Sequence, residues 1–157
     1  MEESKPIYFS FGAKAKVIDK SYVFLSNFYE SPFTVGGHTY RTVEHYFQSQ
    51  KTEDEESKFI IINALTPGSA KGLGRKLQID RELWQQIRVN VMRNAIFLKF
   101  SLNPDLKEKL IATGTRDLRE FSPRDKFWGG SCKNSQNTLG KIIMSVREEL
   151  KNHKDNQ

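Results

Sequence analysis

The sequence predicts a mainly helical α+β fold in a compact single domain, with a small β element near the N-terminus. Residues 81–101 carry apolar side chains three and four positions apart, which is the periodicity of a helix with one buried face. Residues 32–40, PFTVGGHTY, are two apolar arms joined by a pair of glycines, a pattern typical of a β-hairpin. The 157 residues of the chain fit one ordinary domain.

The N-terminal part of the chain predicts strands and then a first helix. Residues 6–12, PIYFSFG, and 21–28, SYVFLSNF, are rich in aromatic and β-branched side chains, so we expect both to form short strands. Thr42 follows the hairpin and is a good N-cap for a helix. Glu44 then lies in the first turn, where the helix dipole stabilises a carboxylate and should keep it ionised.

Local signals place two helices after the first one. Thr52 and Glu55 stand at the spacing of a capping box, so we expect the second helix to start near Thr52. Thr66 and Pro67 suit the N-cap and the first position of a third helix. The glycines that follow Pro67 make this third helix weak.

The longest predicted helix covers residues 81–101 and has Asp80 as its N-cap. Its expected core side chains are Leu83, Trp84, Ile87, Val91, Ala95 and Leu98.

The C-terminal third of the chain predicts a helix, a strand, a loop and a final helix. Asn103 and Pro104 open the helix and Gly114 closes it. Residues 117–121, DLREF, form a possible strand, and residues 122–136 form a loop. The final helix has one apolar face made of Leu139, Ile142, Ile143, Val146 and Leu150.

The chain is basic, with a formal net charge of +6 and a pI of about 9.4. Residues 57–99 hold eight Lys and Arg side chains against two acids, Asp80 and Glu82. Such a balance favours phosphate-bearing partners, and its alternative is a solvated basic surface, which charge alone favours.

Composition also restricts the location of the protein. Cys132 is the one cysteine, so the chain forms no internal disulfide. No apolar stretch reaches the ~20 residues that a membrane span needs. No basic and then apolar leader opens the chain, and we therefore expect a cytoplasmic protein without a membrane partner.

Several kinds of chemistry are disfavoured. His38, His45 and His153 are scattered and Cys132 has no partner at zinc-finger spacing, so we expect no metal and no cofactor. The chain has no G-x-S-x-G element and no P-loop. Residues 129–130, a glycine pair before the last helix, either hold a phosphate on backbone N–H groups or form a plain turn.

Glu44 and Lys51 are a charged pair seven residues apart in TVEHYFQSQK. Seven helical residues turn by about 700°, so both side chains share one face with their Cα atoms about 10 Å apart along the axis. That spacing suits two groups that converge on a ligand. From the residues alone, a solvated helix lysine is the simpler interpretation of Lys51.

Carboxylates also stand beside aromatic rings. Asp125 is followed by Phe127, Trp128 and two glycines in a predicted loop. Trp84 lies on a predicted helix, where periodicity alone favours core packing. Two acids together with stacking rings suit the cleavage of a sugar–base bond, because one acid stabilises or activates, the other handles protons, and the rings hold a base.

Several stretches together resemble the NADAR family of YbiA-like N-glycosidases. They are LSNFYESPFTVGGHTYRTVEHYFQSQK, GLGRKL, LWQQIRVNVMRNAIFLKF, DKFWGG and NTLGKIIMSVREEL, and the resemblance covers about residues 7–150. It implies one domain with a compact, mainly α fold that cleaves N-glycosidic bonds. Members of the family act on phosphorylated riboflavin precursors or remove ADP-ribose from modified guanine bases.

The resemblance also implies site residues. Glu44, Lys51 and Asp125 match the family's catalytic positions, and Lys51 corresponds to a lysine that attacks the ribose as a Schiff-base nucleophile in the members that act on ADP-ribosylated bases. Such a lysine needs a pKa lowered by burial. Arg75 would contact a phosphate. The substrate-binding positions are Ser26, Asn27, Arg75, Trp84, Trp128, Gly129 and Asn137. The loop of residues 129–137 varies among relatives in length and content.

Three functions follow from this resemblance. The first is removal of ADP-ribose from guanine in DNA or RNA, which the basic surface and the lack of a fused cyclohydrolase or reductase domain favour. The second is an N-glycosidase of phosphorylated riboflavin intermediates, whose small substrate needs no basic groove. The third is a non-catalytic binder of ADP-ribose or NAD-like ligands, which would keep Trp84 and Arg75 but not need Lys51 or Glu44.

Overall fold

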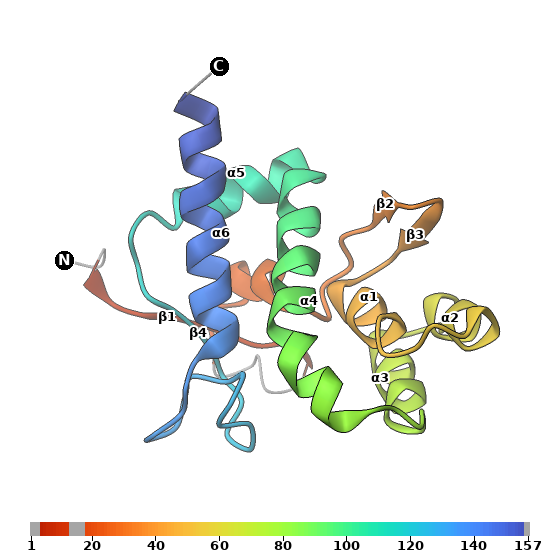
Figure 1. The fold of residues 1–157 in the computed structure, drawn as a ribbon. Coiled ribbons are helices and arrows are strands. Elements are labelled where there is room, and N and C mark those ends of the chain that lie inside the picture. The colour runs from red at the N-terminus through yellow and green to blue at the C-terminus, as the bar shows by residue number, and fades with distance from the viewer. Residues whose placement is uncertain (1–3, 13–17, 156–157) are drawn as a thin grey trace. The chain divides into compact units, whose positions relative to one another are not determined.

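Helices dominate the computed structural model, which describes residues 4–12 and 18–155 (Figure 1). In chain order the elements are β1 (Ile7–Phe9), the 3-10 helix η3 (Lys20–Leu25), β2 (Phe33–Val35), β3 (His38–Tyr40), α1 (Val43–Ser49), α2 (Glu55–Ile62), α3 (Pro67–Arg75), α4 (Arg81–Ser101), α5 (Pro104–Ala112), β4 (Leu118–Glu120) and α6 (Thr138–Asp155). No helix in the described ranges combines the length and hydropathy needed to cross a membrane.

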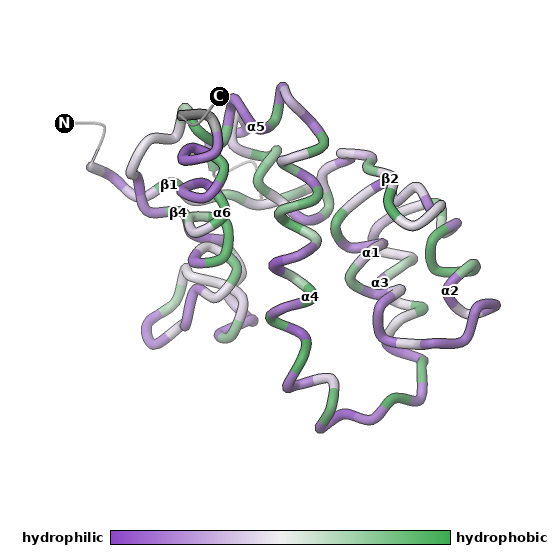
Figure 2. The backbone as a smooth tube through the Cα atoms, turned by 45° about the horizontal axis from the view of Figure 1, so that its top comes forward, coloured by the Kyte–Doolittle hydropathy of each residue, from purple (hydrophilic) through white to green (hydrophobic). Residues whose placement is uncertain are grey.

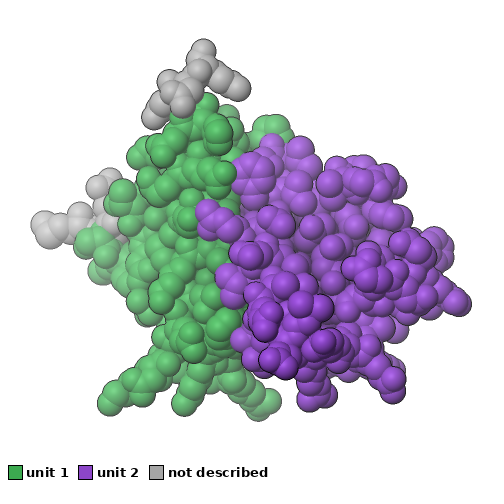
Figure 3. Space-filling model, in the orientation of Figure 1, with its two compact units in different colours: residues 1–29, 104–157 green, residues 30–103 purple. Residues whose placement is uncertain are grey.

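The chain divides into two compact units (Figure 3). Unit 1 consists of residues 1–29 and 104–157, and unit 2 consists of residues 30–103.

In unit 2, the predicted hairpin forms between β2 and β3. The strands are antiparallel, with Phe33 opposite Tyr40. Gly36 and Gly37 have φ values of +59° and +80°, the left-handed conformation that a tight hairpin turn requires at both positions. The Tyr40 ring lies 5.0 Å from the Tyr46 ring of α1, and this contact joins the hairpin to the helix.

The starts of α1 and α3 agree with the predicted caps, whereas the start of α2 does not. The side chains of Thr42 and Thr66 each accept a backbone N–H bond from the first turn of their helix. The predicted Thr52 capping box is wrong, because Asp54 is the N-cap of α2 and accepts the N–H of Ser57 at 2.9 Å. The Thr52 hydroxyl instead accepts the N–H of Asp54 and shapes the preceding turn.

The long helix α4 starts after Asp80 as predicted, but its buried face differs from the predicted one. Apolar and hydrophilic residues alternate along its tube (Figure 2). Leu83 and Ile87 were expected in the core, yet they are 52% and 38% exposed. Burial is concentrated in the C-terminal half of the helix, at Met92, Ala95, Ile96, Lys99 and Phe100. Periodicity defines a face of a helix, but neighbours decide how much of that face is covered.

In unit 1, β1 and β4 form a two-stranded parallel sheet with Tyr8 opposite Arg119. The predicted strands in residues 6–12 and 117–121 are therefore confirmed. The strand predicted for residues 21–28 is wrong, because Lys20–Leu25 is a 3-10 helix. Asp19 explains the difference, since its carboxylate accepts the backbone N–H of Ser21 and so starts a tight turn.

Helix α6 packs on β4 and on α5 within unit 1. Its predicted apolar face is confirmed, because each of its five side chains is buried. Gly114 follows α5 with a φ of +66°, as the predicted helix end requires. The mainly helical α+β fold predicted from the sequence is confirmed, and β4, the strand predicted within residues 117–121, pairs with the N-terminal strand β1.

Candidate active site

A buried carboxyl group lies at the start of α1. Glu44 is in the first turn and its side chain is 6% exposed. The Gln48 side chain, one turn further on, donates a hydrogen bond of 2.7 Å to Glu44 Oε1. Burial raises the pKa of Glu44 above its usual value, although Gln48 and nearby cations act in the opposite direction.

The first-turn position of Glu44 does not dominate its pKa. A first-turn position was expected to keep the carboxylate ionised through the helix dipole. Removal of the side chain from water has the larger effect, so the pKa of Glu44 rises. A carboxyl group with a raised pKa suits a general acid better than a permanently ionised base.

Lys51 lies just beyond the end of α1. The sequence predicts that it continues the helix of Glu44 by two turns, but the helix ends at Ser49. The N–H of Lys51 donates to the carbonyl oxygen of Gln48 at 3.2 Å, which is the tighter bond of a closing turn. The uniform helical rotation between Glu44 and Lys51 is thus not realised. The two groups nevertheless interact electrostatically, as a pair that faces one site would.

Two aromatic rings surround the amine of Lys51. Its Nζ lies 5.6 Å from the centre of the Trp84 ring and 5.9 Å from that of Phe47. The two rings are 5.1 Å apart. Burial lowers the pKa of Lys51, Glu44 opposes this shift, and the neighbouring cations add to it. A lysine in such surroundings releases its proton more readily than a surface lysine does.

Trp84 is half-buried and is not a member of the closed core. Periodicity alone predicts that it packs inside, with Leu83 and Ile87 as its companions. In the structure its ring contacts Phe47 and the Lys51 amine instead. A half-exposed ring beside an amine is suited to a second task, the stacking of a planar ligand.

Lys71 and Arg75 of α3 are two further cations that act on Glu44, in addition to Lys51. Both cations lower the pKa of Glu44 and that of Lys51, so both lie close to the pair. The sequence prediction included Arg75 but missed Lys71 and Gln48. Spacing could have found both, because Lys71 precedes Arg75 by four residues and Gln48 follows Glu44 by four, which places each on its partner's helix face.

A close contact between α1 and α3 holds this arrangement. Gly74 lies against Gln48, and a Cβ atom at Gly74 would overlap the Gln48 side chain. Glycine at this position lets α3 approach the residue that binds Glu44. The glycines that weaken α3 as an isolated helix therefore have a packing reason at Gly74.

The Asp125 carboxylate organises a turn in unit 1. Its Oδ1 accepts the backbone N–H groups of Phe127 at 3.0 Å and of Trp128 at 2.9 Å. The other oxygen, Oδ2, accepts no hydrogen bond from the described part of the chain. Asp125 is half-buried, and one of its carboxylate oxygens supports the loop, whereas a part in ligand binding for the other oxygen stays a prediction.

The loop after Asp125 is closed by backbone hydrogen bonds. Gly129 donates to the Asp125 carbonyl at 3.2 Å and Gly130 donates to the Glu120 carbonyl at 2.9 Å. The first N–H groups of α6 are also used, because Thr138 and Leu139 donate to loop carbonyls. These N–H groups are used within the protein, which favours the plain turn over the alternative of a phosphate site.

Asn137 joins this loop to the sheet of unit 1. Its side chain is buried and donates a hydrogen bond of 3.0 Å to the carbonyl of Leu118 in β4. Asn137 has a φ of +53° and its side chain occupies the space that a Cβ atom at Gly130 or Gly140 would take. These contacts position the loop, and direct binding of a ligand by Asn137 stays a prediction.

Ser26 and Asn27 follow η3 in unit 1 and both are buried. The Ser26 hydroxyl accepts the N–H of Phe28 at 3.2 Å. Ser26 and Phe28 line a shallow pocket of about 320 Å³, together with Phe11 and Phe121. A polar side chain in a pocket with aromatic walls fits the predicted contact with a nucleoside-like substrate.

The predicted site residues fall into two sets. Within unit 2 the structure brings together Glu44, Lys51, Arg75 and Trp84, through the contacts given above. Unit 1 holds the others, which are Ser26, Asn27, Asp125, Trp128, Gly129 and Asn137.

His45 is a packed residue, as the sequence indicates. Its Nδ1 lies 2.7 Å from the Thr42 hydroxyl and its Nε2 lies 3.0 Å from the carbonyl oxygen of Ala64. Among the described residues, no group of three or more His, Cys, Asp or Glu side chains is placed to bind a metal ion.

Comparison with known proteins identifies the family. A model of the NADAR domain matches residues 11–151. A riboflavin biosynthesis protein of Vibrio vulnificus is 41% identical over 137 residues, which are 86% of this chain and 37% of that protein. An N-glycosidase of Nostoc punctiforme is 41% identical over 133 residues, which are 81% of this chain and 85% of that protein.

A solved structure agrees with the sequence relatives. The NMR structure of Escherichia coli YbiA has a TM-score of 0.82 and 33% identity to this chain, and the match covers 98% of this chain and 90% of that one. The Escherichia coli protein is named an N-glycosidase.

The chain belongs to the NADAR family and is a homologue of the YbiA N-glycosidases. The family, the YbiA-like fold and the N-glycosidase class of enzyme predicted from the sequence are thereby confirmed.

Proposed function

We propose that this NADAR-family N-glycosidase removes ADP-ribose from guanine bases of nucleic acid, with Lys51 as the nucleophile. The observation that carries the proposal is the position of the Lys51 amine beside Trp84 and near Glu44. Burial lowers the pKa of Lys51 and raises the pKa of the buried acid Glu44. Both shifts favour neutral groups. A neutral amine can attack carbon, and a neutral carboxyl group can give a proton to a leaving base.

The proposed reaction proceeds through a covalent sugar. The Lys51 nitrogen bonds to the anomeric carbon of the ribose while the bond from that carbon to the base nitrogen breaks. The base leaves with the proton of Glu44, and the Glu44 carboxylate then takes a proton from the new amine. Glu44 then gives its proton to the ring oxygen as the bond from that oxygen to the anomeric carbon breaks, which leaves a protonated imine. Water adds to the imine carbon and gives a proton to the Glu44 carboxylate. The carbon–nitrogen bond of the resulting carbinolamine then breaks as Glu44 protonates the nitrogen and takes the hydroxyl proton, which releases the sugar as an aldehyde and the free Lys51 amine.

Asp125 and the aromatic rings have supporting parts in this proposal. Oδ2 of Asp125 has no partner in the described chain and would accept a hydrogen bond from the substrate or from water. The half-buried ring of Trp84 offers one face to a planar group. Trp128, Gly129 and Asn137 would shape the loop around the substrate.

The positive charges support a substrate with more than one phosphate. Lys71 and Arg75 lie near the proposed catalytic pair, and residues 57–99 carry a formal excess of six positive charges, although one of these residues, Lys99, is buried and burial lowers its pKa to about 7. A pyrophosphate offers these cations two charged groups, whereas a riboflavin precursor with a single phosphate offers one.

A second candidate is an N-glycosidase of phosphorylated riboflavin intermediates. The specific observation in its favour is the name of the Vibrio relative, a riboflavin biosynthesis protein that is 41% identical to this chain. The third expectation, a non-catalytic ligand binder, gives no reason for a buried acid beside an amine of lowered pKa, so we do not favour it.

A side-by-side assay tests the proposal. One arm measures release of ADP-ribose from a guanine-ADP-ribosylated oligonucleotide, and the other measures cleavage of a phosphorylated riboflavin precursor. We expect the higher kcat/KM on the oligonucleotide, and we expect Lys51→Arg to lose that activity. Cleavage of the riboflavin precursor alone would overturn the first candidate in favour of the second.

A further inference from the structure

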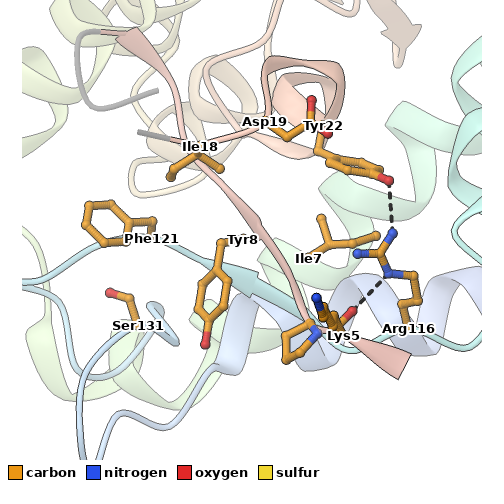
Figure 4. Close-up of a pocket in the computed structure, with 10 residues that line it drawn as sticks. Lys5, Ile7, Tyr8, Ile18, Asp19, Tyr22, Arg116, Phe121 and Ser131 are labelled. Carbon is orange, nitrogen blue, oxygen red and sulfur yellow. Dashed lines mark hydrogen bonds between the residues drawn. The ribbon is translucent and has the colours of Figure 1, made fainter. Parts of the chain in front are cut away.

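A second and larger cavity lies in unit 1, lined by none of the predicted site residues. It has a volume of about 590 Å³. Aromatic side chains of Tyr8, Tyr22 and Phe121 line it, together with the charged groups of Lys5, Asp19 and Arg116 (Figure 4). Flat rings combined with charges of both signs are the features that a nucleotide requires, because its base stacks and its phosphate is anionic.

Tyr8 is the exposed ring of this cavity. Ile7 and Phe9, its neighbours in β1, are buried, and the alternation of a strand places Tyr8 on the opposite face. Its side chain is 40% exposed, so the ring is open to a ligand. The short sheet with β4 fixes the backbone at this position, with Tyr8 opposite Arg119.

Arg116 is held in place by its neighbours. Its Nε donates to the Lys5 carbonyl at 2.9 Å and its Nη1 donates to the Tyr22 hydroxyl at 3.0 Å (Figure 4). Its guanidinium carbon also lies 5.6 Å from the centre of the Tyr22 ring. Nη2 has no hydrogen-bond partner among the residues that the structure describes. The guanidinium is therefore oriented in advance and keeps donors for an anion.

Asp19 brings a negative charge to the same cavity. Its carboxylate accepts the backbone N–H and the hydroxyl of Ser21, at 2.9 and 2.6 Å. Lys5 and Arg116 outnumber it, so the charged lining has an excess of one positive charge. A carboxylate beside a stacking ring also suits the exocyclic amino group of a base.

Phe121 connects this cavity to the Ser26 pocket. The ring lines both hollows, which lie in the same unit. Ser26 is one of the predicted substrate contacts, and Ser122 of the Asp125 loop lines the same smaller pocket. The two hollows share Phe121 as a lining residue, so a strand bound at one hollow lies close to the other.

We propose that the 590 Å³ cavity binds one nucleotide of the single strand that carries the modified guanine, with the base against Tyr8 and a phosphate at Arg116. This inference rests on the proposed function, since it assigns a binding site for the strand beyond the reacting nucleotide. It predicts that an oligonucleotide is a better substrate than an isolated ADP-ribosylated guanosine.

The test compares both substrates in one set of variants. Tyr8→Ala removes the ring, and loss of base stacking weakens nucleic-acid binding by about 5- to 150-fold. We expect kcat/KM on the ADP-ribosylated oligonucleotide to fall about fivefold or more, with no change on ADP-ribosylated guanosine. Tyr8→Phe keeps the ring and should retain oligonucleotide activity. Phe59→Ala, which removes an exposed ring from α2 in unit 2, is the matched control and should leave both activities unchanged.

A binding assay separates this inference from the proposed function. The probe is an unmodified fluorescent single-stranded hexathymidylate, whose affinity is measured by anisotropy. Cleavage of both ADP-ribosylated substrates with no Tyr8→Ala effect, or with an equal effect on both, overturns the nucleotide site and leaves the proposed function standing. Failure of the wild-type protein to cleave either one overturns the proposed function. In that case, weaker hexathymidylate binding by Tyr8→Ala still supports the cavity as a nucleotide site, and unchanged binding overturns it.

Discussion

The Lys51 amine lies 5.6 Å from the centre of the Trp84 ring, so the amine loses water on the side that faces the ring. In the sequence, the helices α2 and α3 both lie between these two residues. This relationship also connects a pKa that burial lowers with a ring that can stack on a substrate.

Replacement of Lys51 tests the covalent step. Lys51→Arg keeps a positive charge but cannot form an imine, so turnover should fall by about 100-fold or more. Borohydride added during turnover of the wild-type protein should trap a sugar adduct, and peptide mapping should locate it at Lys51. Lys76→Arg on the exposed end of α3 is the control and should keep full activity. Normal turnover by Lys51→Arg, or an adduct at another residue, would show that Lys51 is only a cationic contact.

Glu44→Gln separates catalysis from stability. The variant cannot give a proton to the leaving base, so activity should fall by about 100- to 10,000-fold. The pKa of Glu44 is raised above its ordinary value of 4.5 in the folded chain. The folded state therefore binds the proton more tightly than the unfolded state, and the stability that this provides is lost as the pH rises through the folded-state pKa.

Glutamine stays neutral at every pH, so Glu44→Gln should raise the Tm at neutral pH. The difference in Tm between the variant and the wild-type protein should be larger at about pH 8 than at about pH 4.5. Thermal unfolding at both pH values measures it. An equal difference at the two values would mean that Glu44 is ionised with an ordinary pKa.

Two substitutions of Asp125 separate the effect of its charge from the effect of its hydrogen bonds. Asp125→Asn keeps an acceptor for the N–H groups of Phe127 and Trp128, so the turn and the Tm should persist while turnover falls. Asp125→Ala removes both hydrogen bonds and should also lower the free energy of unfolding by about 1–3 kcal/mol. Turnover of purified Asp125→Asn at the wild-type rate would exclude a catalytic part for the carboxylate.

Gly74 is predicted to control the site through packing. Gly74→Ala places a Cβ atom where the Gln48 side chain lies, so Gln48 must leave its hydrogen bond to Glu44. We expect a loss of stability of about 1–3 kcal/mol and a lower kcat. Gly72→Ala in the same helix has open space around its Cβ, so it should stabilise the protein by up to about 1 kcal/mol and keep its activity. Equal behaviour of the two variants in denaturation and kinetics would contradict this account.

Salt dependence distinguishes the two candidate substrates. A single strand that makes three phosphate contacts should bind about 20-fold more weakly at about 200 mM salt than at about 50 mM. Binding releases counterions from the strand, and this release contributes less free energy when the salt concentration is higher. A riboflavin precursor with one phosphate should lose less than about threefold. Titration of each ligand over this range gives the slope. A shallow slope for the oligonucleotide would argue against the use of the basic surface in binding.

Local signals predicted much of the fold because they act over a few residues. Thr42, Thr66 and Asp80 cap their helices as expected, since each side chain bonds to an N–H group three positions away. The same reasoning failed at Thr52, because Asp54 is an equally good cap two residues later. Two caps that differ little in free energy cannot be ranked without the contacts that position the helix.

The sequence by itself determined the family, the number and order of the main helices, the Gly36–Gly37 turn and the apolar face of α6. These properties depend on periodicity and on short-range hydrogen bonds, which the order of residues specifies. The tertiary structure decided which residues lose water. Neighbours from α1, α3 and α4 set the pKa values of Glu44 and Lys51 and the exposure of Trp84. Desolvation depends on every atom that surrounds a group, and that surrounding exists only after helices distant in the chain have packed together.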